Sequence, residues 1–170
     1  MHSTADLMVE IRKEENPSVS EIEKIEIDID QLPLDAAGIR EPKTLHEGRF
    51  SIYFIAALAL REGRITIDSF TEDKVTDPEL ILLRKKVQAR GMFNAALSAK
   101  ARVTMKDGRV YERYTPAPKG STENPVTFEA LKDKFKTTSG LSPAAAEGVI
   151  DKIMHMEQLA SIKEILSLLQ

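Results

Sequence analysis

A chain of 170 residues has the length of one ordinary domain, and its composition, 42% hydrophobic and 30% charged, is that of a globular protein with a packed core. A net charge of −3 excludes the strong positive field that attracts a protein to nucleic acid or to anionic membranes, so neither is expected as a partner. The lack of cysteine excludes disulfides, thiolate metal sites and a cysteine nucleophile. The longest apolar run, residues 52–60, is too short to span a membrane, and we expect a cytoplasmic protein.

The first two segments show clear periodicity. Residues 2–15 place apolar side chains at helical spacing, with Ser3 or Thr4 as the expected cap and Asn16-Pro17-Ser18 as the end. Residues 21–30 alternate isoleucine with charged side chains, which predicts a strand with one buried and one solvated face. Residues 31–45 contain two prolines and a glycine and show no period, so they are predicted to be a long loop of the kind that often has a function.

Two helices are predicted in the middle of the chain. Residues 49–62 have charges only at their ends, so this helix is expected to lie at the centre of the core, with Gly63 as its C-terminal cap. Asp77-Pro78 is typical of a helix start, and the apolar stripe that follows predicts a helix over residues 78–90.

The clearest local signal is a β-hairpin. Residues 99–106 and 109–115 are two strand-like runs, and Asp107-Gly108 between them favours a tight turn of the primed type. Residues 116–125 are then predicted to be a loop.

Helices are predicted for the rest of the chain. Thr127 is expected to cap a helix that extends to Phe135, with Phe128 and Leu131 on its inner face, and further helices are predicted near 143–156 and 159–169. Few strands with helices between them indicate an α+β fold: a two-layer sandwich in which a small, mainly antiparallel sheet packs against helices, followed by C-terminal helices.

No motif for nucleotide, phosphate or metal binding is present, and there is no Gly-x-Ser-x-Gly nucleophile motif. The three histidines, His2, His46 and His155, lie far apart in the sequence and lack metal-ligand spacing. We therefore predict no metal and no cofactor. His155 lies in an amphipathic helix and is interpreted as a surface side chain.

Four residues are candidates for a binding site, each with a plainer alternative. His2 begins the first helix, where the helix dipole favours a neutral imidazole, but terminal residues also fray. His46 precedes the apolar helix in a position that often faces a cleft. Arg49 and Lys119 are candidate contacts for an anion, and otherwise are solvated surface charges.

The sequence resembles the C-terminal domain of the MmgE/PrpD family, the 2-methylcitrate dehydratase-like lyases. No single motif is specific, but their order and spacing extend over almost the whole chain. The matching elements are His2-Ser3-Thr4-Ala5-Asp6, the run from Glu47 to Thr66 with Ile67-Asp68-Ser69-Phe70 after it, Asp77-Pro78, Asp107-Gly108, Lys119-Gly120, Asn124-Pro125, Leu131 and Lys134-Phe135. Gly48 and Arg49 are mild departures, because the family commonly has alanine and lysine there.

The resemblance implies a single domain over residues 1–170, with a helical extension at 142–170, from proteins more than twice this long. Their N-terminal helical domain is expected to be absent. It also implies a cofactor-free reaction that begins with proton removal beside a carboxylate: hydration or dehydration, decarboxylation or epimerisation of a di- or tricarboxylic acid. His2, Arg49 and Ser51 are carried over as pocket or interdomain positions. The family's catalytic residues cannot be placed on this sequence.

Three hypotheses follow. In the first, the chain is part of an enzyme, inactive alone and completed by a helical domain or subunit of the same family. In the second, it is a non-catalytic dimerisation or small-anion-binding module; we expect a homodimer, and the apolar side chains of residues 162–169 are a candidate interface. The third, a self-sufficient enzyme, is the least favoured, because the sequence shows no matched acid–base pair.

Overall fold

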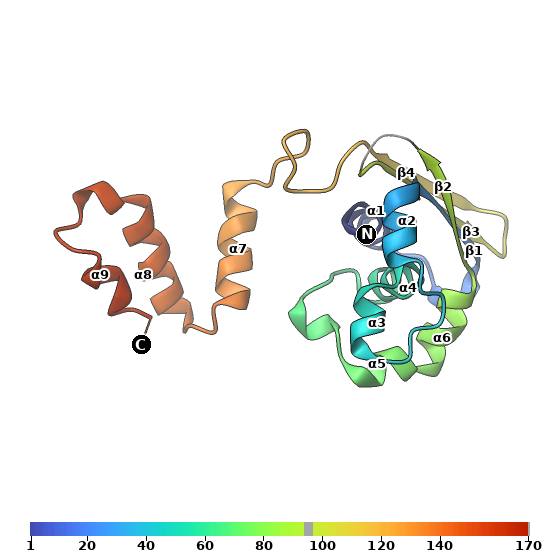
Figure 1. The fold of residues 1–170 in the computed structure, drawn as a ribbon, viewed down its shortest axis with the longest axis horizontal. Coiled ribbons are helices and arrows are strands. Elements are labelled where there is room, and N and C mark those ends of the chain that lie inside the picture. The colour runs from blue at the N-terminus through green and yellow to red at the C-terminus, as the bar shows by residue number, and fades with distance from the viewer. Residues whose placement is uncertain (94–96, 170) are drawn as a thin grey trace. The chain divides into compact units, whose positions relative to one another are not determined.

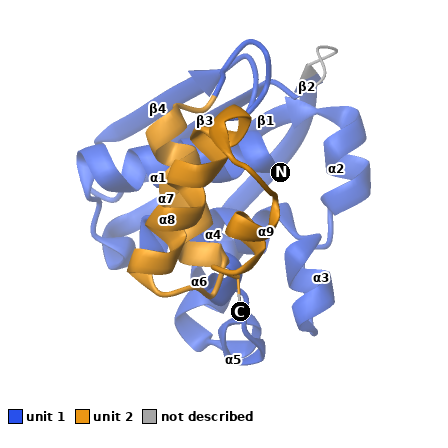
Figure 2. Cartoon of the chain, turned by 90° about the vertical axis from the view of Figure 1, so that its left-hand side faces the viewer, with its two compact units in different colours: residues 1–125 blue, residues 126–170 orange. Residues whose placement is uncertain are grey.

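The computed structural model describes residues 1–93 and 97–169 (Figure 1). The chain divides into two compact units, Met1–Pro125 and Val126–Gln170, which are coloured separately in Figure 2. The helical extension was expected to begin at residue 142, whereas the segment that separates from unit 1 begins at Val126 and so includes one more helix.

Unit 1 contains a mixed sheet of four strands in the order β2-β1-β3-β4. Strand β1 pairs in parallel with β2, and antiparallel with β3, which forms the hairpin with β4. The strands are β1 (Ile22–Asp30), β2 (Val87–Phe93), β3 (Ala99–Met105) and β4 (Val110–Thr115). Two of the three pairings are antiparallel, so the predicted α+β sandwich with a mainly antiparallel sheet is confirmed.

One face of this sheet is covered by helices (Figure 1). Helices α1 (His2–Glu15) and α4 (Ile52–Glu62) pack on it and on each other, and α6 (Pro78–Lys85) packs on α4. The isoleucines of β1 lie in this core, and nine consecutive residues of α4, from Ile52 to Leu60, are buried. The prediction that α4 is the central buried helix is confirmed, and burial of its apolar side chains is the main force holding the two layers together.

Shorter elements complete the two units. Unit 1 also contains η1 (Val19–Glu21), α2 (Gln31–Ala37), α3 (Leu45–Arg49), η2 (Ile67–Ser69) and α5 (Glu72–Thr76). Unit 2 contains α7 (Phe128–Thr138), α8 (Pro143–Met154), η3 (Met156–Gln158) and α9 (Lys163–Leu166). None of the helices in the described part of the chain combines the length and the apolar content of a transmembrane span.

Two predictions in unit 1 are wrong. Residues 31–45 are not a continuous loop: the Asp30 carboxylate accepts a hydrogen bond from the Leu32 amide at 2.9 Å and caps α2, and α3 begins at Leu45. The helix predicted over 78–90 ends at Lys85, and Val87, which continued its apolar stripe, instead begins β2. Pairing with β1 over five residues overrides the local helical pattern there.

Several predicted boundaries also shift. Neither Ser3 nor Thr4 caps α1: both lie inside the helix and are buried. The helix predicted over 159–169 is reduced to Lys163–Leu166. Phe128 and Leu131, expected on an inner face of α7, are 44% and 49% exposed.

Candidate functional site

A cavity with a volume of about 460 Å³ lies beside α2 and the first turn of α4. Its polar lining consists of Gln31, Asp35, Arg40 and Tyr53. Leu34, Ile39 and Ala89 form its apolar wall. A concave site with apolar walls and a few convergent polar groups is typical of a small-molecule pocket.

A bridge between two distant segments lies next to this cavity. Gly38 pairs with Ser51 in an isolated antiparallel β-bridge, and the Ser51 hydroxyl donates a hydrogen bond to the Ile39 carbonyl at 2.5 Å. Gly38 is required by the close packing of the turn, since an added Cβ would lie 2.6 Å from the Leu34 carbonyl oxygen. The bridge holds the segment after α2 against the start of α4.

Arg40 and Tyr53 meet at the cavity because of this bridge. The guanidinium carbon of Arg40 lies 4.8 Å from the centroid of the Tyr53 ring, within cation–π distance. Tyr53 is fixed by the core, with 3% of its surface exposed, while Arg40 is exposed. Among the described residues, no carboxylate forms an ion pair with Arg40, which lines the cavity.

An amide–carboxylate pair also lines the cavity. The Gln31 side-chain amide donates a hydrogen bond to Asp35 Oδ1 at 2.6 Å, one turn apart on α2. Gly91 of β2 makes room for this amide, because a Cβ there would lie 2.0 Å from Gln31 Oε1. The pair therefore depends on the absence of a side chain at position 91.

A buried arginine holds the segment that follows Arg40. Arg84 of α6 is 9% exposed, and its Nη1 donates to the carbonyls of Val75 at 3.2 Å and Pro42 at 3.4 Å. Burial lowers the pKa of its guanidinium, while Glu41 acts to raise it. These bonds attach the backbone two residues after Arg40 to the helical layer.

The cavity offers a defined chemistry. A guanidinium presents several N–H donors in the geometry that suits a carboxylate. A phenol beside it can donate a hydrogen bond, or a proton, to an oxygen or carbon of the same ligand. The site can therefore bind a small carboxylate, and it places one group capable of proton transfer next to that carboxylate.

The five residues predicted from the sequence lie in three places. Ser51 is fully buried next to the cavity, where its hydroxyl accepts from the Phe54 amide at 3.1 Å and caps α4, besides donating to Ile39. His46 and Arg49 are exposed on α3: the His46 ring lies 5.1 Å from that of Phe50, and the Arg49 guanidinium lies 5.9 Å from the Phe70 ring.

His2 and Lys119 lie together at the start of α1. His2 and Pro118 line a second, small cavity of about 30 Å³, and the Lys119 amide donates to Asp6 Oδ2 at 2.9 Å. Both side chains are exposed. The structure thus joins the first turn of α1 to the 116–125 loop, but it leaves both residues outside the Arg40–Tyr53 cavity.

Sequence reasoning missed Gln31, Asp35, Arg40 and Tyr53. Tyr53 was assigned to the apolar body of a helix, and the other three to a loop. The only signal was the expectation that the long segment 31–45 has a function. Among the described residues, no group of three or more histidine, aspartate or glutamate side chains has the geometry of a metal site.

Together, the fold and the cavity define an α+β domain with a pocket lined by polar and apolar side chains. The chain belongs to the MmgE/PrpD family: residues 1–157 match the model of the MmgE/PrpD C-terminal domain. It is 28% identical to human (Homo sapiens) cis-aconitate decarboxylase over 137 residues, and 27% identical to the same enzyme of the mouse (Mus musculus). Each match covers 76% of this chain and 28% of the relative, so the chain spans less than a third of the curated relatives that it matches.

Proposed function

We propose that this chain supplies the C-terminal part of a lyase active site that acts on a di- or tricarboxylic acid. The observation that supports this most directly is the cavity in which Arg40 lies over Tyr53. In this proposal Arg40 binds a substrate carboxylate and Tyr53 faces the carbon or oxygen that exchanges a proton. Both matched relatives are named for a reaction of cis-aconitate, a tricarboxylate.

The chain is proposed to be inactive alone and to be completed by a helical domain or subunit of the same family. Proton abstraction without a cofactor needs an acid and a base in one cleft, and this cavity provides only one side of such a pair. The chain also spans only 28% of its relatives' length, so groups from elsewhere in such proteins are available to complete the site.

Unit 2 has the surface that such a partner needs. Among the described residues of unit 2, only three apolar ones, Ala146, Val149 and Ile165, belong to the buried core. Eight large apolar side chains on unit 2 are more than two-fifths exposed: Phe128, Leu131, Ile153, Met154, Met156, Ile162, Leu166 and Leu169. A unit of this size rarely folds on so small a core, and an apolar partner surface would supply the missing burial.

A titration with cis-aconitate, followed by calorimetry or by amide chemical shifts, tests the carboxylate site. Arg40→Gln is expected to weaken binding at least about tenfold, since it removes a charge-assisted hydrogen bond. Arg64→Gln is the matched control, because it removes the same group from an exposed position after α4 that does not line the cavity, and it is expected to bind like the parent chain. Equal binding by the Arg40→Gln variant would show that the carboxylate site lies elsewhere.

An activity assay distinguishes two hypotheses. In the first, the chain is part of an enzyme; in the alternative, it is a non-catalytic dimerisation or small-anion-binding module. The chain alone, and the chain mixed with the helical domain of a relative, are assayed for loss of cis-aconitate or 2-methylcitrate. Turnover only in the mixture, reduced by Tyr53→Phe, is the expected result. Binding of the acid without turnover in the mixture would favour the alternative. A homodimer and a cytoplasmic location are part of the proposal.

A further inference from the structure

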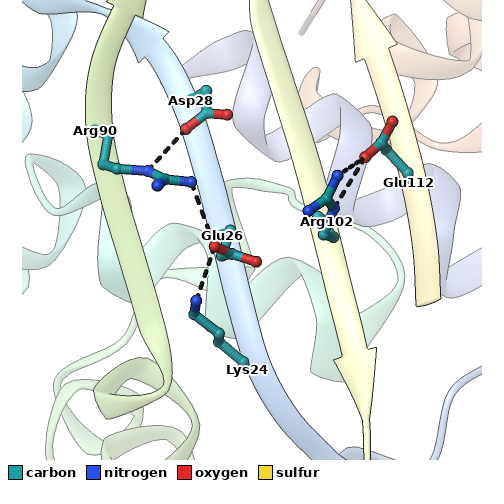
Figure 3. Close-up of polar contacts among 6 residues, drawn as sticks. All are labelled: Lys24, Glu26, Asp28, Arg90, Arg102 and Glu112. Carbon is teal, nitrogen blue, oxygen red and sulfur yellow. Dashed lines mark hydrogen bonds and ion pairs between the residues drawn. The ribbon is translucent and has the colours of Figure 1, made fainter. Parts of the chain in front are cut away.

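Charged side chains on the four strands of the sheet pair with one another (Figure 3). Arg90 of β2 bonds Asp28 of β1 at 3.1 Å, and Arg102 of β3 bonds Glu112 of β4 at 2.7 Å. The charges of these side chains are compensated within the chain, without a ligand.

The cavity beside α2 is different. Its charged lining consists of one cation and one carboxylate, Arg40 and Asp35, and no ion pair joins them. Asp35 Oδ1 accepts a hydrogen bond from the uncharged Gln31 amide at 2.6 Å, and its other oxygen, Oδ2, bonds to none of the described residues. A positive and a negative group therefore line one cavity without neutralising each other.

Each of the two charges is tied to its own structural element. Gln31 and Asp35 are one turn apart on α2, and the Gln31 side chain lies against Gly91, where an added Cβ would be 2.0 Å from Gln31 Oε1. The Arg40 guanidinium lies 4.8 Å from the ring centroid of Tyr53, which belongs to α4. The cavity thus presents two opposite charges from two separate helices of the domain.

We infer that the ligand of this cavity is a zwitterion, an amino dicarboxylic acid, with a carboxylate on Arg40 and its ammonium group on Asp35. The inference rests on the proposed function, because it uses the carboxylate site at Arg40, and it narrows the class of acid bound there. A carboxylate at Asp35 attracts an ammonium group and repels a further carboxylate of the ligand. Asp35 is therefore a specificity-determining residue, which acts by attraction and by repulsion together.

The charge of Asp35 favours an ammonium group over a hydroxyl. An ionised carboxylate accepts a hydrogen bond from either, but the bond from a cation is shorter and stronger. Asp35 is exposed, so water screens its charge and the preference is moderate. The expected discrimination is therefore a matter of several-fold in affinity, and a matched set of ligands is needed to measure it.

A series of four-carbon acids tests the inference. Succinate, malate and aspartate have the same two carboxylates and differ in one substituent: a hydrogen, a hydroxyl or an ammonium group. The full chain is titrated with each acid at pH 7 and constant ionic strength, and binding is followed by amide chemical shifts. Aspartate is expected to bind about five- to tenfold more tightly than succinate, with malate between them.

Asp35→Asn separates specificity from folding, since asparagine has the same size and can still accept from the Gln31 amide. The variant is expected to bind aspartate about fivefold more weakly than the parent, and succinate no more weakly, because the lost charge attracts one and repels the other. Damage to the fold would weaken both. Asp68→Asn is the matched control: it removes an exposed carboxylate on η2 that does not line the cavity, and it should keep the parent's preference.

The outcomes distinguish this inference from the proposed function. Succinate or malate binding as tightly as aspartate, or an Asp35→Asn variant that keeps the full preference for aspartate, would overturn the inference and leave the carboxylate site at Arg40 intact. Failure of all three acids to bind would also overturn it. The cis-aconitate titration of the parent and of Arg40→Gln then shows whether the proposed function fails as well.

Discussion

Arg40 lies 4.8 Å from the centroid of the Tyr53 ring although the two residues belong to different segments, one after α2 and one in α4. The contact exists because Ser51 joins the segments, donating to the Ile39 carbonyl and accepting from the Phe54 amide. A single buried hydroxyl thus supports both the start of the central helix and the wall of the cavity.

Ser51→Ala is expected to lower the free energy of unfolding by about 1–2 kcal/mol, because it removes a helix cap and leaves a carbonyl without its donor. Urea unfolding followed by circular dichroism measures the change. Thr44→Ala is the control: it removes the cap of α3, where Thr44 accepts from the Glu47 amide at 3.2 Å, but that helix has five residues and is largely exposed. A Ser51→Ala variant no less stable than Thr44→Ala would contradict this account of the bridge.

Gly38→Ala is expected to destabilise the chain by roughly 1–3 kcal/mol, since its Cβ would lie 2.6 Å from a backbone oxygen that cannot move freely. Gly48→Ala is the matched control. A Cβ at position 48 meets only side-chain atoms of Val75 and Phe54, at 3.2 and 3.3 Å, and these can adjust. Thermal unfolding of the two variants should show the larger loss for Gly38→Ala, together with weaker binding of cis-aconitate; equal losses would mean that the turn is not tightly constrained.

Leu58→Ala tests the buried helix. Leu58 is fully buried in α4, and truncation of such a side chain typically costs about 2–5 kcal/mol. Leu32→Ala makes the same change where the side chain is 74% exposed, and is expected to stay within about 0.5 kcal/mol of the parent. The difference between the two unfolding free energies measures the contribution of the core, and similar values would show that α4 is not its centre.

The sequence predicted those elements whose signals are local. The hairpin follows from Asp107-Gly108, but its turn is not of the predicted primed type, because Gly108 has φ of 86° and Asp107 has no positive φ. The end of α1 follows from Asn16, with φ of 42°. Helix α4 follows from an apolar run that ends at Gly63, whose φ is 70°. In each case a residue suited to a left-handed conformation marks the boundary.

The missed features depend on contacts between distant segments. Strand β2 has glycine and arginine where a strand usually has branched side chains, and its state is decided by parallel pairing with β1. The cavity depends on the Gly38–Ser51 bridge and on the space above Gly91, neither of which has a pattern in the sequence. The family resemblance identified Ser51 as a candidate site residue. It did not identify the nearby Tyr53, which lies in an apolar run that predicts a core helix.

Asp77 is expected to make part of the stability depend on pH. Its Oδ2 bonds Arg61 at 2.6 Å, and its Oδ1 accepts from the amides of Glu79 at 2.8 Å and Leu80 at 3.1 Å. The hydrogen bond from Arg61, followed by those from the backbone amides, holds the pKa of Asp77 below its ordinary value of 3.8, although burial opposes this. A carboxyl group whose pKa is lower in the folded state stabilises the fold fully above its ordinary pKa, and this contribution is lost as the pH falls through the folded-state value.

Asp77→Asn separates the charge from the cap, since asparagine also caps helices well. At pH 7 the variant is expected to be less stable than the parent by about 0.5–1 kcal/mol, because the Arg61 side chain is only 19% exposed and the pair is partly shielded from water. The difference should begin to shrink as the pH falls below the ordinary value of 3.8, and it should be lost once the pH lies below the folded-state pKa, where the parent is protonated as well. Urea unfolding at pH 7, 5, 4 and 3 measures it. Glu79→Gln is the control, since its carboxylate lies 3.7 Å from the same guanidinium and is 64% exposed; it should show a smaller difference at every pH. A difference for Asp77→Asn that persists unchanged at pH 3 would mean that lost packing, rather than lost charge, is responsible.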